Sequence, residues 1–311
     1  MIVRQNWESL KDLDVVASNI MVEGLKVEFL KDPTLTRKRP PGVVTGHIQS
    51  ARLEEFITPW LKEGIIGRGK DAEEGFFSRM FTVPKDGGKW RPIIDLSDLN
   101  KRLKKRSFKM EDLKSVVKLI RPGMWAVKLD LKDAYFHVPL HPLIWNLFKF
   151  VLRKKGKLRS FFFKRLPFGL TIAPWAFTRI LAPLKKILRL KNIIISAFLD
   201  DFLILARSRE EALEHTGIVI NLLQDYGFRI NWEKSSPEPV RILEYLGVVV
   251  DLENLTFSLP EEKVLKILSL CHKSQRVEKI SRRELEKIVG FLNFAAGYIK
   301  WGKLYLKPIQ R

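Results

Sequence analysis

Apolar residues recur at two spacings along the chain, and these spacings predict different secondary structures. Spacings of three and four residues predict helices over residues 48–61, 113–120 and 175–190. Runs of β-prone residues on either side of turns rich in Lys and Gly predict two hairpins, over residues 80–94 and 148–163. Helices and strands therefore alternate irregularly, without an internal repeat.

Both ends of the chain carry further structural signals. Residues 37–42 combine positive charge with helix-breaking Pro and Gly, which predicts a linker after an N-terminal extension. Near the C-terminus, Pro260 and the two glutamates after it open a helix, and Ser281 with Glu284 forms a capping box that opens another. We expect these two helices to pack against each other.

Composition adds a strong charge imbalance. The chain has 311 residues, of which 46% are hydrophobic, enough for a buried core. It contains 56 Lys and Arg against 35 Asp and Glu, a net charge of +21. Such an excess favours a polyanionic partner, above all nucleic acid, because each phosphate neutralised by a base releases condensed counterions. A basic protein without such a partner is the alternative.

The cysteine count and the apolar runs bear on the compartment. Cys271 is the only cysteine, which excludes an internal disulfide and makes an intracellular protein, in the cytoplasm or nucleus, the expectation. No second Cys/His cluster accompanies Cys271 and His272, so we expect a buried helical thiol rather than a metal ligand. The N-terminus lacks the apolar segment of a signal peptide, and runs such as residues 193–195 are too short to cross a bilayer, so no membrane partner is expected.

The candidate chemistry lies in three acidic residues. Asp200 and Asp201 lie between two apolar runs, where adjacent carboxylates are costly unless their turn opens to solvent or to a cation. A solvated turn explains this pair when it is taken alone. Asp130, however, ends the strand predicted over residues 125–129 and could lie at the edge of the same sheet. Phosphoryl transfer from a nucleoside triphosphate uses two divalent cations, and carboxylates are the hard ligands that Mg²⁺ requires.

Several segments between residues 76 and 251 resemble, in order, the motif series of reverse transcriptases. They are residues 81–85, 90–96, 99–100, 129–136, 166–170, 173–177, 198–201, 227–234 and 245–247. One segment alone would be weak, but all of them in this order and at this spacing make chance resemblance remote. One departure is Phe198, where the family usually has tyrosine. The acids that follow it are intact, so we expect activity to survive.

The resemblance implies an α+β, right-hand polymerase fold with fingers, a palm whose antiparallel sheet carries the acids, and a helical thumb. The implied division is an N-terminal extension and linker over 1–45, fingers over 46–104 and 139–168, palm over 105–138 and 169–255, and thumb over 256–311. No stretch after Tyr305 is long enough for an RNase H domain, so we expect the polymerase portion alone.

The resemblance also implies the catalytic groups. Asp130, Asp200 and Asp201 would bind two Mg²⁺ ions, or Mn²⁺, and the Leu131 carbonyl would be a further oxygen ligand. Lys234 resembles the lysine proposed to protonate pyrophosphate. The implied reaction is RNA-directed DNA synthesis, in which the 3′-hydroxyl of a DNA primer is extended with dNTPs on an RNA template.

A second group of residues is expected to contact the incoming dNTP. Its members are Lys85, Arg91, Asp133, Ala134, Tyr135, Phe168 and Gly169. Lys85 and Arg91 would neutralise the triphosphate, and the backbone amides of Asp133 and Ala134 would meet its phosphates. The Tyr135 ring would exclude a ribose 2′-hydroxyl by its volume. Ordinary core packing is the alternative for this aromatic residue.

Primer and template contacts are expected on a palm hairpin and on the thumb. The resemblance puts Tyr245, Leu246 and Gly247 at the primer terminus. Basic thumb residues would hold an RNA–DNA hybrid or duplex DNA by its phosphates; they are Arg282, Arg283, Lys287, Lys300, Lys303 and Lys307. A solvated helix face explains any single one of these bases equally well.

The subgroup and two other functions stay open. Residues 108–111, 289–295 and 302–303 look most like tyrosine-recombinase retrotransposons of the DIRS group, with gypsy-type elements and pararetroviruses as close competitors. One alternative function is a domesticated, catalytically silent nucleic-acid-binding protein, against which the three intact acids argue. The other is a palm polymerase that uses ribonucleotides, against which Tyr135 argues.

Overall fold

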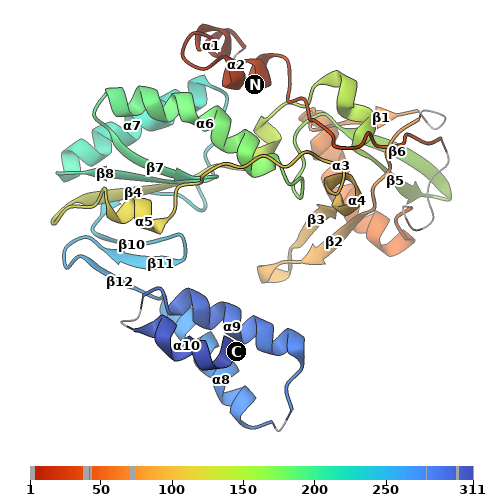
Figure 1. The fold of residues 1–311 in the computed structure, drawn as a ribbon. Helices are drawn as coiled ribbons and strands as arrows, with labels where there is room; N and C mark the ends of the chain where they lie inside the picture. The colour runs from red at the N-terminus through yellow and green to blue at the C-terminus, as the bar shows by residue number, and fades with distance from the viewer. Residues whose placement is uncertain are drawn as a thin grey trace.

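The computed structural model describes residues 4–37, 42, 44–70, 74–277, 279–298 and 301–310, and Figure 1 shows how they are arranged. The linker predicted over residues 37–42 lies mostly outside these residues, and so does Lys300. Among the helices within these ranges, none is both long and apolar enough to cross a membrane.

A four-stranded antiparallel sheet forms the palm. Its strands, in spatial order, are β7 (Ile194–Phe198), β8 (Asp201–Ala206), β4 (Trp125–Asp130) and β9 (Ser236–Val240). Helices α6 (Ala173–Leu190) and α7 (Arg209–Asp225) cover one face of this sheet (Figure 1). The strand predicted before Asp130 and the helix predicted over 175–190 are confirmed.

The palm sheet is buried on both faces. Successive side chains of a strand point to opposite sides, so each strand contributes to two hydrophobic clusters. Val127, Phe202 and Ile204 enter the main core on the side of α6 and α7. Ala126 and Leu203, from the same two strands, belong to a second hydrophobic cluster. Apolar packing on both sides therefore anchors the sheet edge that carries the acids.

The second cluster lies between the palm sheet and a smaller layer. This layer contains β10 (Ile242–Tyr245), β11 (Val248–Asp251), β12 (Thr256–Ser258) and helix α5 (Leu113–Val117), and it lies opposite α6 and α7 (Figure 1). Helix α5 ends three residues earlier than the stripe over 113–120 predicts. The chain continues as a turn in which the amides of Leu119 and Ile120 both bond to the Val116 carbonyl.

Two segments far apart in the sequence build the fingers. Their elements are α3 (His47–Lys62), β1 (Ile66–Gly69), β2 (Met80–Pro84), β3 (Trp90–Ile94), α4 (Ser97–Asn100), β5 (Lys149–Lys154) and β6 (Lys157–Phe163). β1 pairs with β6, which pairs with β5, while β2 and β3 form a separate hairpin. Both predicted hairpins and the helix predicted over 48–61 are confirmed. The exact limits of fingers, palm and thumb stay predictions.

The N-terminal extension packs onto the palm. It forms α1 (Arg4–Ser9) and α2 (Val15–Val22), which lie against α6 and the end of α7 (Figure 1). Trp7 is fully buried, and its Nε1 donates a 3.1 Å hydrogen bond to the Tyr226 carbonyl. The extension is therefore part of the palm core.

The C-terminal region is helical. It contains α8 (Glu261–Gln275), α9 (Arg282–Ala295) and α10 (Gly302–Gln310). The capping box of Ser281 and Glu284 is confirmed. The expectation that two helices pack against each other is confirmed for α8 and α9. A third helix, α10, was not predicted; it packs on α9, with Leu306 buried.

The expectation that Cys271 is buried was wrong. Cys271 lies in α8, as predicted, but it is partly exposed. Helix α8 has no buried residue, since its main packing partner is α9. Cys271 therefore lies in a helix, but its thiol is not part of a hydrophobic core.

Candidate active site

Backbone pairing brings the three acids to one sheet edge. Asp130, the last residue of β4, lies directly opposite Asp201, the first residue of β8. The amide of Leu131 donates a 2.9 Å hydrogen bond to the Asp200 carbonyl. Leu199, with φ of 54°, forms the tight turn between β7 and β8. Positions far apart in the sequence thus become neighbours.

The segment after α7 holds Asp130 in place. Asn231 Nδ2 donates a 2.8 Å hydrogen bond to Asp130 Oδ1, and Lys234 Nζ lies 3.9 Å from Oδ2. The Asp130 amide donates to Ser235 Oγ at 2.9 Å. Asp130 is 6% exposed, and this burial raises the pKa of its carboxyl even though Lys234 and Asn231 act in the opposite direction.

The carboxyl of Asp200 responds to the same surroundings. Burial raises its pKa, and the negative charges of Asp130 and Asp201 raise it further. Two partly buried carboxylates that repel each other are stabilised by a cation nearby. A donor set made of oxygen atoms alone suits a hard divalent ion such as Mg²⁺. Asp130 and Asp200 therefore fit a metal-binding role by their chemistry.

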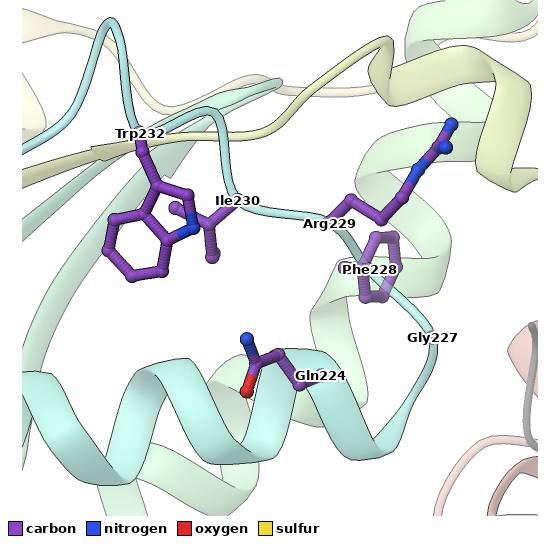
Figure 2. A pocket seen from close by; sticks show the side chains of 6 residues that line it. All are labelled: Gln224, Gly227, Phe228, Arg229, Ile230 and Trp232. Atoms are coloured by element: carbon purple, nitrogen blue, oxygen red, sulfur yellow. The ribbon is translucent and has the colours of Figure 1, made fainter.

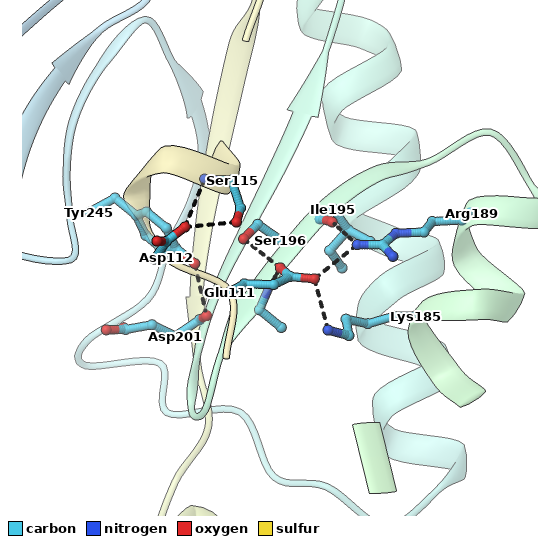
Figure 3. Close-up of polar contacts among 10 residues, drawn as sticks. Glu111, Asp112, Ser115, Lys185, Arg189, Ile195, Ser196, Asp201 and Tyr245 are labelled. Atoms are coloured by element: carbon cyan, nitrogen blue, oxygen red, sulfur yellow. Dashed lines mark hydrogen bonds and ion pairs between the residues drawn. The ribbon is translucent and has the colours of Figure 1, made fainter. Parts of the chain in front are cut away.

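Asp201 is engaged differently. Lys128 Nζ lies 3.5 Å from its Oδ1, and Tyr245 Oη donates a 3.2 Å hydrogen bond to its carbonyl (Figure 3). Within the part of the chain that the structure describes, no three or more Asp, Glu, His or Cys side chains are grouped as a metal-binding cluster. A third carboxylate ligand from Asp201, and the Leu131 carbonyl as ligand, stay predictions.

A partly buried carboxylate, that of Glu111, supports the strand leading into the acidic turn (Figure 3). It accepts hydrogen bonds from Ser196 Oγ at 2.7 Å and from the Ala197 amide at 2.9 Å, both in β7. Lys185 and Arg189 of α6 each lie 2.9 Å from its Oε1. Burial alone would raise the pKa of Glu111, but the hydrogen bond and charge of Lys185 hold it below its ordinary value.

Tyr135 lies close to the acids in a short 3-10 helix, η2 (Ala134–His137). Its ring packs against Phe168 at 5.0 Å and Phe177 at 5.8 Å between centroids. Burial, with a smaller contribution from the charge of Asp200, raises the pKa of Tyr135 to about 12. Phe168 is 43% exposed, so the pair formed by these two aromatic residues expected at the nucleotide is partly open to solvent.

The other backbone positions expected at the nucleotide border this aromatic pair. Asp133, with φ of 52°, is the residue immediately before η2, whose first amides have no acceptor within the helix. Ala134 is buried. Gly169 has φ of 92°, and its carbonyl accepts a 2.8 Å hydrogen bond from Asn100 Nδ2, while Asn100 Oδ1 accepts one from the Thr171 amide. Asn100 thus holds the turn after Phe168.

Lys85 and Arg91 lie on the β2–β3 hairpin. Arg91 pairs with Val83 across the hairpin, and the Lys85 amide bonds to the Lys89 carbonyl in the turn. Both side chains are exposed, and neither forms an ion pair with any residue in the described ranges. Their charges are therefore free to meet an anion.

The predicted primer contacts are only partly accessible. Tyr245 is fully buried, and its hydroxyl supports the Asp201 carbonyl, so its position at the primer terminus stays a prediction. Leu246 and Gly247, with φ of 50° and 78°, form the turn between β10 and β11. Lys263 Nζ donates a 2.7 Å hydrogen bond to the Gly247 carbonyl. This contact joins the hairpin to α8.

The predicted phosphate contacts of the thumb are exposed on α9. Arg282, Arg283 and Lys287 all face solvent. Arg282 pairs with Glu286 at 2.9 Å, a contact between highly exposed groups that stabilises little. These bases are exposed and available to nucleic acid, and their contact with phosphates stays a prediction.

Three supporting residues were not assigned a role from the sequence. Asn231 belongs to a recognised motif, and Glu111 to a subgroup marker, but their contacts arise only on folding. Lys128 had a usable signal, because it lies two positions before Asp130 in one strand and so shares its face.

A cavity of about 350 Å³ lies beside the segment that carries Asn231 (Figure 2). Its lining residues are Gln224, Gly227, Phe228, Arg229, Ile230 and Trp232. Trp232, one of these lining residues, is 54% exposed. The cavity shows that this segment, which holds Asp130, is not packed on all sides.

Fingers, a palm sheet with three acids at one edge, and a helical thumb define a right-hand polymerase fold. The chain belongs to the reverse transcriptase family: the model of the reverse transcriptase (RNA-dependent DNA polymerase) family matches residues 83–250. Enzymes of this family generally use divalent metal ions.

Curated viral polymerases are similar in sequence. Protein P of duck hepatitis B virus (strain United States/DHBV-16) is 27% identical over 225 residues, covering 70% of this chain and 26% of that protein. The Pro-Pol polyprotein of simian foamy virus type 1 is 26% identical over 257 residues, covering 83% of this chain and 21% of the polyprotein. The chain thus spans about a quarter of the length of these relatives.

Solved structures share the fold. A foamy viral protease-reverse transcriptase in complex with dsDNA matches 94% of this chain and 46% of its own, with a TM-score of 0.72 and 19% identity. The foamy viral enzyme in complex with an RNA/DNA hybrid matches with a TM-score of 0.67 and 18% identity, over 94% of this chain and 36% of that one.

Proposed function

We propose that this chain is an RNA-directed DNA polymerase that extends a primer 3′-hydroxyl with dNTPs. The observation that carries the proposal is the sheet edge shared by Asp130 and Asp200, two carboxyls whose pKa values are raised by burial and by the negative charges of neighbouring aspartates. Membership of the reverse transcriptase family supports it. So do the dsDNA and the RNA/DNA hybrid bound by the foamy viral enzymes of the same fold.

Two Mg²⁺ ions, or Mn²⁺, would be held by Asp130 and Asp200, with Asp201 and the Leu131 carbonyl as further ligands. When bound, such ions activate the primer hydroxyl and stabilise the charge of the leaving pyrophosphate. Lys234 would donate a proton to the pyrophosphate. Its 58% exposure and its distance of 3.9 Å from Asp130 Oδ2 support this role.

The incoming dNTP would contact two groups of residues. Lys85 and Arg91, both exposed and without an ion pair among the described residues, would neutralise its triphosphate. The Tyr135 ring would lie under the sugar and exclude a ribose 2′-hydroxyl; its electrostatic coupling to Asp200 supports this position. RNA template and DNA primer would bind chiefly through phosphates, as the net charge of +21 favours.

Incorporation of dNTPs on an RNA template with a DNA primer tests this function. We expect the native protein to extend the primer, and Asp200→Asn to abolish extension while the protein still folds. Asp225→Asn is the matched control, because Asp225 is an exposed carboxylate at the end of α7. Equal extension by the native protein and Asp200→Asn would refute the assignment. A native protein that binds an RNA–DNA hybrid without extending it would be a silent nucleic-acid-binding protein.

We also infer that this chain is encoded by a retrotransposon of the DIRS group, which carries a tyrosine recombinase, and that the protein acts inside the cell. The segments 108–111, 289–295 and 302–303 support the subgroup, and the single cysteine supports the compartment. A tyrosine-recombinase reading frame beside the coding sequence, and nuclear or cytoplasmic fluorescence of a tagged protein, test these two statements. A neighbouring integrase of another type would refute the first.

A further inference from the structure

His137 is a buried histidine with a polar partner at each ring nitrogen. It is 6% exposed and belongs to η2, two residues after Tyr135. Its Nδ1 lies 3.1 Å from the Ala134 carbonyl, and its Nε2 accepts a 3.1 Å hydrogen bond from the Arg229 amide. A carbonyl only accepts and a backbone amide only donates, so the ring is neutral and carries its proton on Nδ1.

The Arg229 end of this contact leads to Asp130. Residues 229–231 run antiparallel to residues 130–132, with Ile230 bridged to Leu131. The Lys132 amide bonds to the Arg229 carbonyl, and the Asn231 amide to the Asp130 carbonyl, each at 2.8 Å. His137 therefore bonds to the same segment, residues 229–231, whose Asn231 side chain holds the Asp130 carboxylate.

Packed rings connect the same histidine to Tyr135. The His137 ring lies 5.2 Å from that of Phe228, the neighbour of Arg229 in the segment shown in Figure 2. Phe228 lies 6.1 Å from Phe177, and Phe177 lies 5.8 Å from Tyr135. Polar bonds and ring contacts thus join one residue to both the predicted metal ligand and the predicted sugar-contacting ring.

We propose that His137 is a positioning residue that sets the Tyr135 ring relative to Asp130, and so contributes to the selection of dNTPs over NTPs. This inference rests on the proposed polymerase function. Without the Arg229 bond, η2 would lose its direct hydrogen bond to residues 229–231, and the Tyr135 ring could withdraw from a 2′-hydroxyl. Burial, aided by the charges of Arg229 and Arg165, lowers the pKa of His137 to about 4, so the neutral ring that this bond requires persists at neutral pH.

Three substitutions separate the two bonds of the ring. His137→Gln places an acceptor within reach of the Arg229 amide, whereas the shorter side chain of His137→Asn can still donate to the Ala134 carbonyl within η2 but should not reach the Arg229 amide. His137→Leu removes both. The matched control is His141→Leu, because His141 Nδ1 also accepts a backbone amide, that of Leu143, outside the acidic site.

The discriminating measurement is the ratio of kcat/KM for a dNTP to that for the matching NTP. We expect His137→Leu and His137→Asn to lower this ratio about tenfold, as loss of a supporting hydrogen bond does at metal sites. His137→Gln and the control should retain it. An unchanged ratio in His137→Leu, even with a lower overall rate, would reduce His137 to a core residue and overturn the proposal. If His137→Leu fails to fold, the Gln and Asn pair decides.

Hydrogen exchange of residues 227–232 tests the bond without catalysis. We expect faster exchange in His137→Leu and His137→Asn, and native exchange in His137→Gln. Native exchange in all three would overturn the proposed link. A native protein that incorporates neither dNTPs nor NTPs would refute the polymerase function, and with it the role in selection, whatever the exchange result says of the link.

Discussion

The side-chain amide of Asn231 donates a 2.8 Å hydrogen bond to the carboxylate of Asp130, 101 residues earlier in the chain. The backbone amide of Asn231 also bonds to the Asp130 carbonyl, so one residue holds both the main chain and the side chain of a predicted metal ligand. A neutral donor orients the carboxylate without competing with a cation for its charge. Residues that orient metal ligands in this way commonly matter almost as much as the ligands themselves.

We expect Asn231→Ala to fold and to lose about 10- to 100-fold in dNTP incorporation, because the Asp130 carboxylate becomes free to rotate. The measurement is single-turnover primer extension over a range of Mg²⁺ concentrations, in which the variant should need more metal. Asn19→Ala, on the exposed side of α2, is the control. Native rates in Asn231→Ala would show that Asp130 does not depend on this bond.

Glu111 supports β7 close to the acidic turn, through Ser196 and Ala197, and its loss should show in stability. Removing one partner of a partly buried ion pair leaves the other uncompensated, so we expect Glu111→Gln to lower the free energy of unfolding by roughly 2–4 kcal/mol at neutral pH. Urea unfolding measures this change. The control is Glu238→Gln, whose highly exposed pair with Arg209 should contribute less than about 1 kcal/mol.

The same residue predicts a pH dependence of definite sign. The pKa of Glu111 is lower in the folded chain than its ordinary value of 4.5, so its contribution is complete above that value and is lost as the pH falls below it. The difference in unfolding free energy between native protein and Glu111→Gln should therefore shrink on acidification from about pH 5 to about pH 3. A constant difference over this range would contradict the assignment of the shift to Glu111.

Local patterns predicted most of the elements around the site. The β2–β3 hairpin follows from apolar runs around a turn with two glycines of positive φ, Gly87 and Gly88, and the capping box at Ser281 follows from four adjacent residues. The meeting of Asp130 with the acidic turn was predicted from its position at the end of an expected strand, and the order of the family motifs supported it. Helix α10 was missed because it is short and contains Pro308.

What the sequence did not predict depends on long-range contacts. Glu111 takes its donors from β7 and α6, and no pattern near position 111 signals these partners. The burial of the Tyr245 ring between the palm sheet and the β10–β12 layer was likewise not predicted. Both outcomes require the packing of whole layers, which residue spacing alone does not encode.

The N-terminal extension should be needed for palm stability. Trp7 is fully buried against Tyr226 and Phe228, so Trp7→Ala should lower the free energy of unfolding by about 3–5 kcal/mol. Trp7→Phe keeps a ring and should lose less, chiefly the bond to the Tyr226 carbonyl. Thermal or urea unfolding checks this order, with the exposed Trp301 changed to Ala as the control. Equal stability of Trp7→Ala and native protein would show that the extension is only loosely attached.

The exposed bases of α9 should contribute to salt-sensitive binding of nucleic acid. Each lost phosphate contact reduces the slope of log K against log salt by about 0.9, so Arg283→Ala with Lys287→Ala should reduce it by about 2 on an RNA–DNA hybrid. Fluorescence anisotropy at several salt concentrations measures the slope. The control double variant, Arg4→Ala with Lys26→Ala, removes the same charge from the N-terminal extension. Equal slopes in both double variants would assign the effect to net charge rather than to the thumb.

Tyr135 provides the sharpest test of substrate choice. Its ring is supported by Phe168 and Phe177, so the space beneath the sugar should be limited by ring volume rather than by the phenol. We expect Tyr135→Ala to raise the ratio of NTP to dNTP incorporation by about 10- to 200-fold, as contacts of this size discriminate. Tyr135→Phe keeps the ring and should stay selective. If Tyr135→Phe is as permissive as Tyr135→Ala, the hydroxyl rather than the volume excludes the ribose, and equal use of NTPs and dNTPs by the native protein would favour a ribonucleotide polymerase.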